Sequence, residues 1–201
     1  METLGILREE HRTLAAVLHG MLYLVREIRA GRAVPDFKVL GAMLYYIDIF
    51  PERFHHPKED RYLFRLLRLR CQEARHLLDR LESEHRAGQR KLLQLSQALA
   101  RYQQGGAREF YAFEAIAEAY AAFEFSHMRT EETELMPLAE KYLTPSDWDE
   151  IDKAFLDHDD PLFGVTAGEN FREVFCRIVN LAPPPIGLGP EIVVPKANVV
   201  R

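Results

Sequence analysis

Cysteine is scarce in this sequence, and the two that it has, Cys71 and Cys176, have no CxxC partner. They provide neither a disulfide framework nor a zinc knuckle, so a reducing compartment is the simplest interpretation. No apolar run approaches the roughly 18 residues that a membrane-spanning helix needs. The first residues also lack the basic-then-apolar pattern of a signal peptide. We therefore expect a cytoplasmic protein with no membrane association.

Blocks of a single charge are also missing. The net charge is −5, and acidic and basic residues alternate along the chain, so we expect no nucleic-acid partner. The chain has an ordinary globular composition, with 47% hydrophobic and 28% charged residues over a length of 201. That length allows one domain with a sizeable core and room for an appendage.

Apolar residues recur at helical spacing in four long segments. These segments cover residues 3–30, 36–69, 72–103 and 107–142. Short connections make neighbouring helices antiparallel. The expected fold is therefore all-α, an up-down-up-down four-helix bundle over residues 1–142. Two prolines inside the second segment, Pro51 and Pro57, are expected to bend or interrupt its helix.

The remainder of the chain is expected to be accessory to the bundle. Thr144-Pro145-Ser146-Asp147 has the threonine cap, early proline and following acid of a helix start, which predicts a short helix over 145–157. Another helix is expected over 167–181, so residues 143–181 would pack on the bundle as accessory helices. The Pro/Gly-rich residues 182–201 would form an extended tail. If a homodimer forms, we expect it to use this C-terminal region.

The most informative pattern is a histidine followed four residues later by a glutamate. It occurs at His55 and Glu59 and again at His127 and Glu131. On a helix this spacing places both side chains on one face, one turn apart. A single HxxxE would be a weak signal, but two copies on two predicted helices of one bundle predict a common site.

Two further histidines, His11 and His85, fall on the apolar faces of the other two segments. Counted from the connecting turns, His11 lies about as deep as His55, and His85 about as deep as His127. At about 1.5 Å rise per residue, the mismatches amount to roughly 3 Å. Four histidines from four helices are therefore expected in one layer of the bundle.

Together these six residues have the chemistry of a metal site. Imidazole binds divalent iron, zinc, copper or manganese, and carboxylates can bridge two ions. Six ligands are too many for one four-coordinate zinc, so we predict two metal ions with open positions for water or a small ligand. A buried polar layer without metal is the alternative interpretation.

The combined pattern resembles the hemerythrin-like, or HHE cation-binding, domain. The pattern comprises His11, His55-x-x-x-Glu59, His85 and His127-x-x-x-Glu131. The local sequences HHPKEDRYLF, ESEHRAG and HMRTEETELMP carry the same resemblance over about residues 3–142. The later DPLFG, residues 160–164, looks like an extension of some bacterial members.

The resemblance implies a non-haem di-iron centre, joined as Fe-O-Fe or Fe-OH-Fe, with manganese or zinc as alternatives. Glu59 and Glu131 would bridge the two ions. His11 and His55 would hold one ion, and His85 and His127 the other. These roles follow from the resemblance and not from the spacing of the residues.

The third segment departs from the oxygen-carrying members of this family, which have HxxxH there. Leu81 stands four residues before His85, and Gln89 four residues after it. The centre is therefore expected to be one imidazole short. His56 or a water molecule would take that place, although His56 points about 100° from His55 on a regular helix. The gap leaves room for dioxygen, nitric oxide or peroxide.

Three functions fit these features. The first is a di-iron protein that senses or binds dioxygen, nitric oxide or reactive oxygen species, in stress response or iron homeostasis. The second is a di-iron peroxidase or oxidase, and the third is an interaction module that metal merely holds together. No substrate pocket or acid/base pair stands out beyond the ligand set, so the first function ranks above the second.

Other residues near the motifs are expected to be structural. They are the histidines His19, His76 and His158, the solvated acids Glu132 and Glu134, and the tyrosines Tyr45, Tyr46 and Tyr120, for which donation to a ligand is the second interpretation. Gly88, three residues after His85, is expected to leave space beside that imidazole. Cys71 is expected to be a buried or turn thiol.

Overall fold

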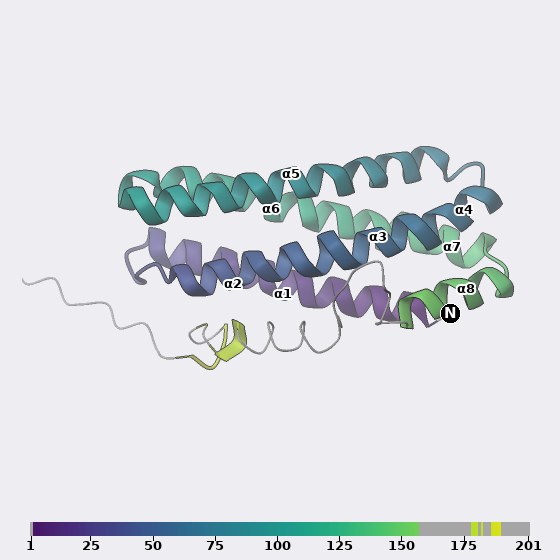
Figure 1. The fold of residues 1–201 in the computed structure, drawn as a ribbon, viewed down its shortest axis with the longest axis horizontal. Helices are drawn as coiled ribbons and strands as arrows, with labels where there is room; N and C mark the ends of the chain where they lie inside the picture. The colour runs from purple at the N-terminus through teal and green to yellow at the C-terminus, as the bar shows by residue number, and fades with distance from the viewer. Residues whose placement is uncertain (1, 157–177, 181, 183–185, 190–201) are drawn as a thin grey trace, which may run out of the picture.

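The structure is a computed structural model that describes residues 2–156, 178–180, 182 and 186–189. Four helical rods lie lengthwise beside one another (Figure 1), and no β-strand occurs among the described residues. The all-α helical bundle predicted from the sequence is confirmed. None of the helices in these ranges is both long enough and apolar enough to cross a membrane.

The rods follow the four predicted segments in order. The first rod is α1 (Thr3–Arg29). The second contains α2 (Phe37–Ile47), the π-helix η1 (Asp48–His55), α3 (His56–Lys58), the π-helix η2 (Glu59–Phe64) and α4 (Arg65–Arg70). The third is α5 (Arg75–Gly105). The fourth contains the 3-10 turn η3 (Gly106–Glu109), α6 (Phe110–Thr130), the π-helix η4 (Glu131–Leu135) and α7 (Met136–Tyr142), and α8 (Pro145–Leu156) follows it.

Helix ends coincide with residues suited to them. Gly31, just beyond α1, and Gly106, just beyond α5, have φ angles of 68° and 67°, a backbone region that favours glycine and stops a helix. Asp36 caps α2, because its carboxylate accepts hydrogen bonds from the backbone N–H groups of Lys38 and Val39 at 2.9 and 3.1 Å.

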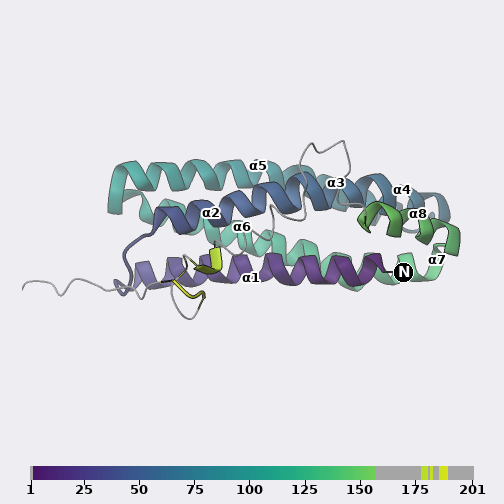
Figure 2. The ribbon, with the colours of Figure 1, turned by 60° about the horizontal axis from the view of Figure 1, so that its bottom comes forward.

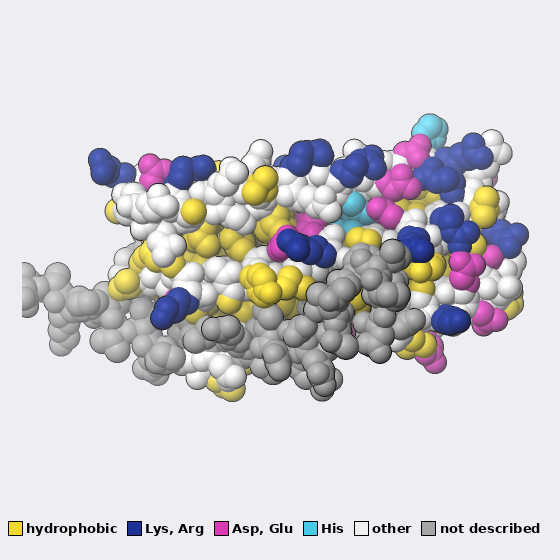
Figure 3. Space-filling model, in the orientation of Figure 1, with side chains coloured by type: hydrophobic (Ala, Val, Ile, Leu, Met, Phe, Trp, Pro, Cys, Tyr) yellow, Lys and Arg dark blue, Asp and Glu magenta, His cyan; other side chains and the backbone are white. Residues whose placement is uncertain are grey.

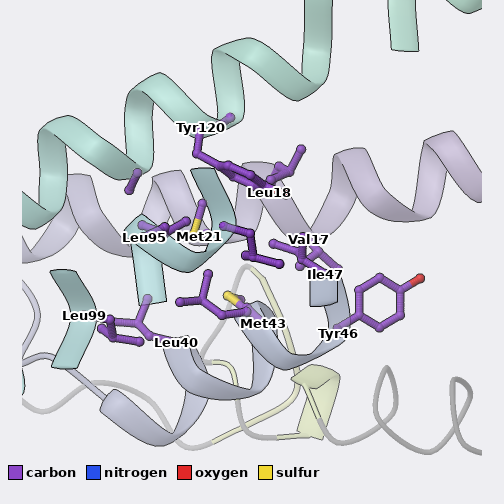
Figure 4. Packing of buried hydrophobic residues seen from close by; sticks show 14 of the residues in the cluster. Val17, Leu18, Met21, Leu40, Met43, Tyr46, Ile47, Leu95, Leu99 and Tyr120 are labelled. Atoms are coloured by element: carbon purple, nitrogen blue, oxygen red, sulfur yellow. The ribbon is translucent and has the colours of Figure 1, made fainter. Parts of the chain in front are cut away.

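The hydrophobic core consists of two separate clusters along the length of the bundle. The first contains residues such as Leu18, Met43 and Phe113, and the second contains residues such as Leu7 and Leu78. Figure 4 shows the first cluster, in which side chains from all four rods point toward one another. The predicted histidine and glutamate positions fall between the two clusters on the first three rods, and on the fourth rod they lie on either side of Met128, at the edge of the first cluster. A polar layer therefore divides the core.

The second rod departs from regular α-helix at both predicted prolines without ending there. Pro51 lies inside η1, and Pro57 lies in the first turn of α3. Proline contributes no backbone N–H group. In this rod both prolines lie in or next to segments where the backbone hydrogen bonds have changed from the α-helical to the π-helical pattern. The expected interruption is thus a change of helical pitch over residues 48–64, which is the kind of distortion often found at functional sites.

The predicted helix after the bundle is confirmed as α8, which begins at Pro145 and ends at Leu156. It lies beside α1 at the end of the bundle where the chain starts (Figure 2). The carboxylate of Asp152 accepts hydrogen bonds from the backbone N–H and the hydroxyl of Thr3 at 2.9 and 2.6 Å. These bonds fix the start of α1 to α8.

The C-terminal stretch differs in part from the extended tail that we expected. Ala182 is fully buried in the first hydrophobic cluster together with Ile178, and Ile186 packs against that cluster. A Cβ atom at Gly20 of α1 would lie 3.0 Å from Ile186, so this glycine allows the close approach. Apolar side chains favour burial over exposure. Most of the predicted helix 167–181, and residues 190–201, lie outside the described residues.

We expect replacement of Asp147 by asparagine to destabilise the protein by about 1–2 kcal/mol. Its carboxylate accepts hydrogen bonds from the backbone and hydroxyl of Thr144, at 2.9 and 2.7 Å, and from Arg70 of α4, at 2.8 and 2.9 Å. The bond with Arg70 is the main cause of a pKa well below the usual value for Asp147. This stability should therefore be complete above the ordinary aspartate pKa and decline as the pH falls below it. Urea unfolding of Asp147→Asn against the exposed control Asp149→Asn measures the effect, and equal midpoints would contradict it.

Candidate metal centre

Seven buried polar side chains from all four rods meet in the layer between the two hydrophobic clusters. None is more than 4% exposed. They form two groups, and within each group the nitrogen or oxygen atoms lie within 4.8 Å of one another. One group contains His11, His55, Glu59 and Glu131, and the other contains His56, His85 and His127. The structure therefore brings together the six residues singled out in the sequence and adds His56. Their role as metal ligands stays a prediction.

The two glutamates lie between these groups. Glu131 has one carboxylate oxygen 3.2 Å from His11 Nε2 and the other 3.2 Å from His127 Nε2. One oxygen of Glu59 lies 3.3 Å from His55 Nε2 and 3.5 Å from His85 Nε2. Each carboxylate thus faces one histidine from each group. A carboxylate in this position could bridge two ions.

A ring of four carboxylates surrounds the layer and fixes its histidines. Each accepts a hydrogen bond from the Nδ1–H of one imidazole at 2.7 to 3.0 Å. The pairs are Glu10 with His55, Asp60 with His85, Glu84 with His127, and Glu132 with His11. In every pair the acid on one rod holds the histidine of the next rod, and the fourth rod closes the ring on the first.

This ring determines which imidazole nitrogen is free. A carboxylate at Nδ1 favours the tautomer or charge state in which Nδ1 carries the proton, so the neutral ring keeps its lone pair on Nε2. The Nε2 atoms face the interior of the layer, where those of His85 and His127 approach to 3.1 Å. A histidine held in this way by an outer carboxylate is the common arrangement around protein-bound metals.

His127 and Glu131 form a buried ion pair. Burial opposes a charge on His127, but Glu131, Glu84 and Glu59 outweigh it and raise its pKa to about 11. Burial alone would raise the pKa of Glu131, yet His127, His11 and His85 hold it well below the usual value. A metal ion entering the layer would therefore displace protons from imidazole, as metal binding generally does.

The other two central groups favour their neutral forms. Burial raises the pKa of Glu59 well above its usual value, and the neighbouring Glu131 adds to the effect. Burial, together with the nearby His85, His55 and His127, lowers the pKa of His56 well below the ordinary value. His56 is thus a neutral imidazole, the form that binds a metal ion.

His56 reaches the layer because the second rod is not a regular α-helix around it. It directly follows η1 and stacks on His85, with ring centroids 4.1 Å apart and 12° between the planes. A regular helix would separate His55 and His56 by about 100°. The wider π-turns on both sides let two consecutive histidines face the interior. The second rod thus adds a fifth imidazole to the layer.

The residues present fit a pair of metal ions. His11 Nε2 and all four carboxylate oxygens of Glu59 and Glu131 are buried without a hydrogen-bond partner among the described residues. Unpaired buried polar atoms are costly, and these converge on common points with the nitrogen and oxygen donors that iron, manganese or zinc accepts. Two of the seven side chains, Glu59 and Glu131, face both groups of histidines.

Several structural interpretations need correction. Glu132 is not merely solvated, because it holds the His11 imidazole. Glu134, by contrast, is 56% exposed and faces only Arg80 at 3.6 Å. Tyr45 is 55% exposed and so is not a core residue. The nearest neighbours of a Cβ at Gly88 are the carboxylates of Glu52 and Glu124 and not the His85 imidazole.

The remaining structural predictions hold where the structure describes the residues. Tyr46, Tyr120 and Cys71 are buried, and His19 and His76 are exposed. His158 and Cys176 lie outside the described ranges.

Sequence reasoning missed the outer carboxylates. A signal was present, because each stands next to a motif residue: Glu10 beside His11, Asp60 beside Glu59, Glu84 beside His85, and Glu132 beside Glu131. The partner of each acid lies on a different rod, so the pairing itself could not be read from the chain. Glu52 and Glu124, also buried, had no signal beyond their place near the motifs.

Comparison with known families agrees with this geometry. A family model described as Hemerythrin HHE cation binding domain matches residues 3–139. No curated protein and no solved structure matches the chain. The matched region includes all seven residues of the layer and the four outer carboxylates.

Replacement of Glu10 by glutamine should weaken metal binding roughly tenfold, the low end for loss of an outer partner. Glutamine keeps an acceptor near His55 Nδ1 but removes the charge that makes the imidazole a better donor to metal. Glu9→Gln is the matched control, because Glu9 is exposed and pairs with Arg12 at the surface. Competition with a chelator of known affinity gives both constants. Equal affinities in the two variants would show that the ring does not tune the centre.

Proposed function

The chain belongs to the hemerythrin HHE cation-binding family, and on that premise we propose that it is a non-haem di-iron protein that binds or senses a small ligand. The ligand class is dioxygen, nitric oxide or a reactive oxygen species such as peroxide. The proposed setting is stress response or iron homeostasis. The observation that carries the proposal is the position of Glu59 and Glu131, each shared between two groups of histidines.

In this proposal His11 and His55 hold one ion, and His56, His85 and His127 hold the other. Glu59 and Glu131 would serve both. Counting the shared carboxylates, the first ion has four protein ligands and the second has five. Iron prefers about six ligands in such oxygen- and nitrogen-rich sites, so the first ion keeps more open positions. When bound, the iron pair supplies reversible redox change and these open positions.

The protein residues then restrict what can reach the centre. The seven side chains are almost completely buried, and hydrophobic clusters close the layer on both sides. We expect so buried a layer to admit a diatomic molecule or peroxide and to exclude a bulky organic substrate. The outer carboxylates hold the imidazoles in place while the ligand binds, which reduces the reorganisation that binding requires.

Elemental analysis of the purified chain should find about two metal ions per chain, with iron as the main one. The double variant His55→Ala with Glu59→Ala should retain about none, because it removes one ligand of the first ion and a shared carboxylate. His19→Ala is the control, since His19 is exposed and stacks on Phe125. Removing the metal from the unaltered chain should lower its melting temperature, since buried carboxylates lose their counter-ions. A chain without metal, however it is purified, would contradict the proposal.

The iron-loaded chain should change its near-ultraviolet and visible absorption when dioxygen or nitric oxide is added, without consuming the ligand continuously. The reason is that the less coordinated ion offers an open position inside a closed core. Steady consumption of peroxide would instead identify a peroxidase. A chain that holds two ions and responds to neither ligand, yet melts on chelation, would be an interaction module in which metal only stabilises the bundle.

A further inference from the structure

A second group of buried acids lies outside the seven-residue layer. Glu52 of η1 is 2% exposed and Glu124 of α6 is fully buried. None of their four carboxylate oxygens has a hydrogen-bond partner among the described residues. Burying two ionised carboxyl groups side by side is costly, and burial accordingly raises the pKa of both acids. These two side chains therefore need an explanation beyond the fold.

The two carboxyl groups meet beside Gly88 of α5. A Cβ atom at Gly88 would lie 2.8 Å from an oxygen of Glu52 and 3.4 Å from an oxygen of Glu124. Any larger residue at position 88 would occupy the space where the carboxylates meet. Glycine inside a long helix costs about 1 kcal/mol relative to alanine, and here its lack of a side chain leaves the space that the two carboxyl groups occupy.

The imidazole of His56 lies beside this pair of acids and connects them with the seven-residue layer. Its Nδ1 atom is buried without a hydrogen-bond partner and lies 3.6 Å from Glu52. The other four histidines of the layer all have Nδ1 bound to an outer carboxylate. His56 is thus the one imidazole of the layer whose second nitrogen is left available toward the two acids.

Glu52 also lines a surface groove. The groove has a volume of about 700 Å³ and runs between α2 and α5, and its lining includes Glu52 and the ion pair of Asp48 with Arg53. Figure 3 shows the face where it lies, with hydrophobic side chains between the two helices. Glu52 therefore lines the groove on one side and faces His56 of the metal layer on the other.

We propose that Glu52 and Glu124 form a transit site for divalent cations between this groove and the dinuclear centre. Carboxylate oxygens suit ferrous or manganous ions, and two adjacent buried acids attract cations over anions or neutral molecules. The transit site would bind an ion weakly and pass it to the seven-residue layer. This role rests on the proposed function, because it assumes that the layer is a metal centre.

The test follows the rate at which the metal-free chain takes up Co²⁺, read from the visible absorption of the bound ion. The double variant Glu52→Gln with Glu124→Gln keeps the shape of both side chains and removes their charge. It should load about tenfold more slowly than the unaltered chain, by loss of cation focusing, and still reach about two ions per chain. Glu118→Gln, an exposed acid on the same helix as Glu124, should load at the unaltered rate.

A second variant, Gly88→Ala, keeps both charges and fills the point where they converge. It should also slow loading, because its Cβ would displace the Glu52 carboxylate. If the double variant does not fold, the two single glutamine variants serve instead. Unaltered rates in these variants would overturn the transit site while leaving the proposed function intact. A lower final ion count would also overturn it, since the acids would then belong to the centre. Failure of the unaltered chain to bind Co²⁺ would remove both proposals.

Discussion

The structure depends on one arrangement, the pairing of four of the five inward-facing imidazoles with a carboxylate from the preceding rod. Four such bonds close a ring through all four rods. They fix both the rotation of each imidazole and the depth at which neighbouring rods face each other, because a shift of one residue would move the acid about 1.5 Å along its helix. Apolar packing alone fixes the axial position of one rod relative to its neighbour less specifically than these hydrogen bonds do.

This ring explains how a polar layer persists in the middle of a hydrophobic core. Its outer acids lie near the surface, where Glu132 and Asp60 remain 43% and 40% exposed, so they retain part of their hydration. The central groups, Glu59 and Glu131, have no such access and rely on histidines or on bound cations. The hydrophobic clusters on either side exclude water, which strengthens every charge interaction inside the layer.

The second rod deviates most from a regular α-helix, and this deviation positions several residues of the site. Its two π-helices let His55 and His56 both face inward, and Glu52 lies in the first of them. The same distortion therefore supplies the fifth imidazole of the layer and one acid of the proposed transit site. Gly88 on the facing helix leaves the space that this acid occupies. Site and access route are thus linked through one irregular stretch of backbone.

The amino-acid sequence was sufficient to predict the helical bundle, the start of α8 and the convergence of six motif residues, because these follow from helical periodicity, capping chemistry and counting along rods of fixed rise. It could not determine the inward turn of His56, the partners of Glu10 or Glu84, or the burial of Glu52 and Glu124. Those depend on how far each rod is rotated and where its pitch widens into π-helix. Such angles are set by packing between segments distant in the chain, so only the tertiary structure decides them.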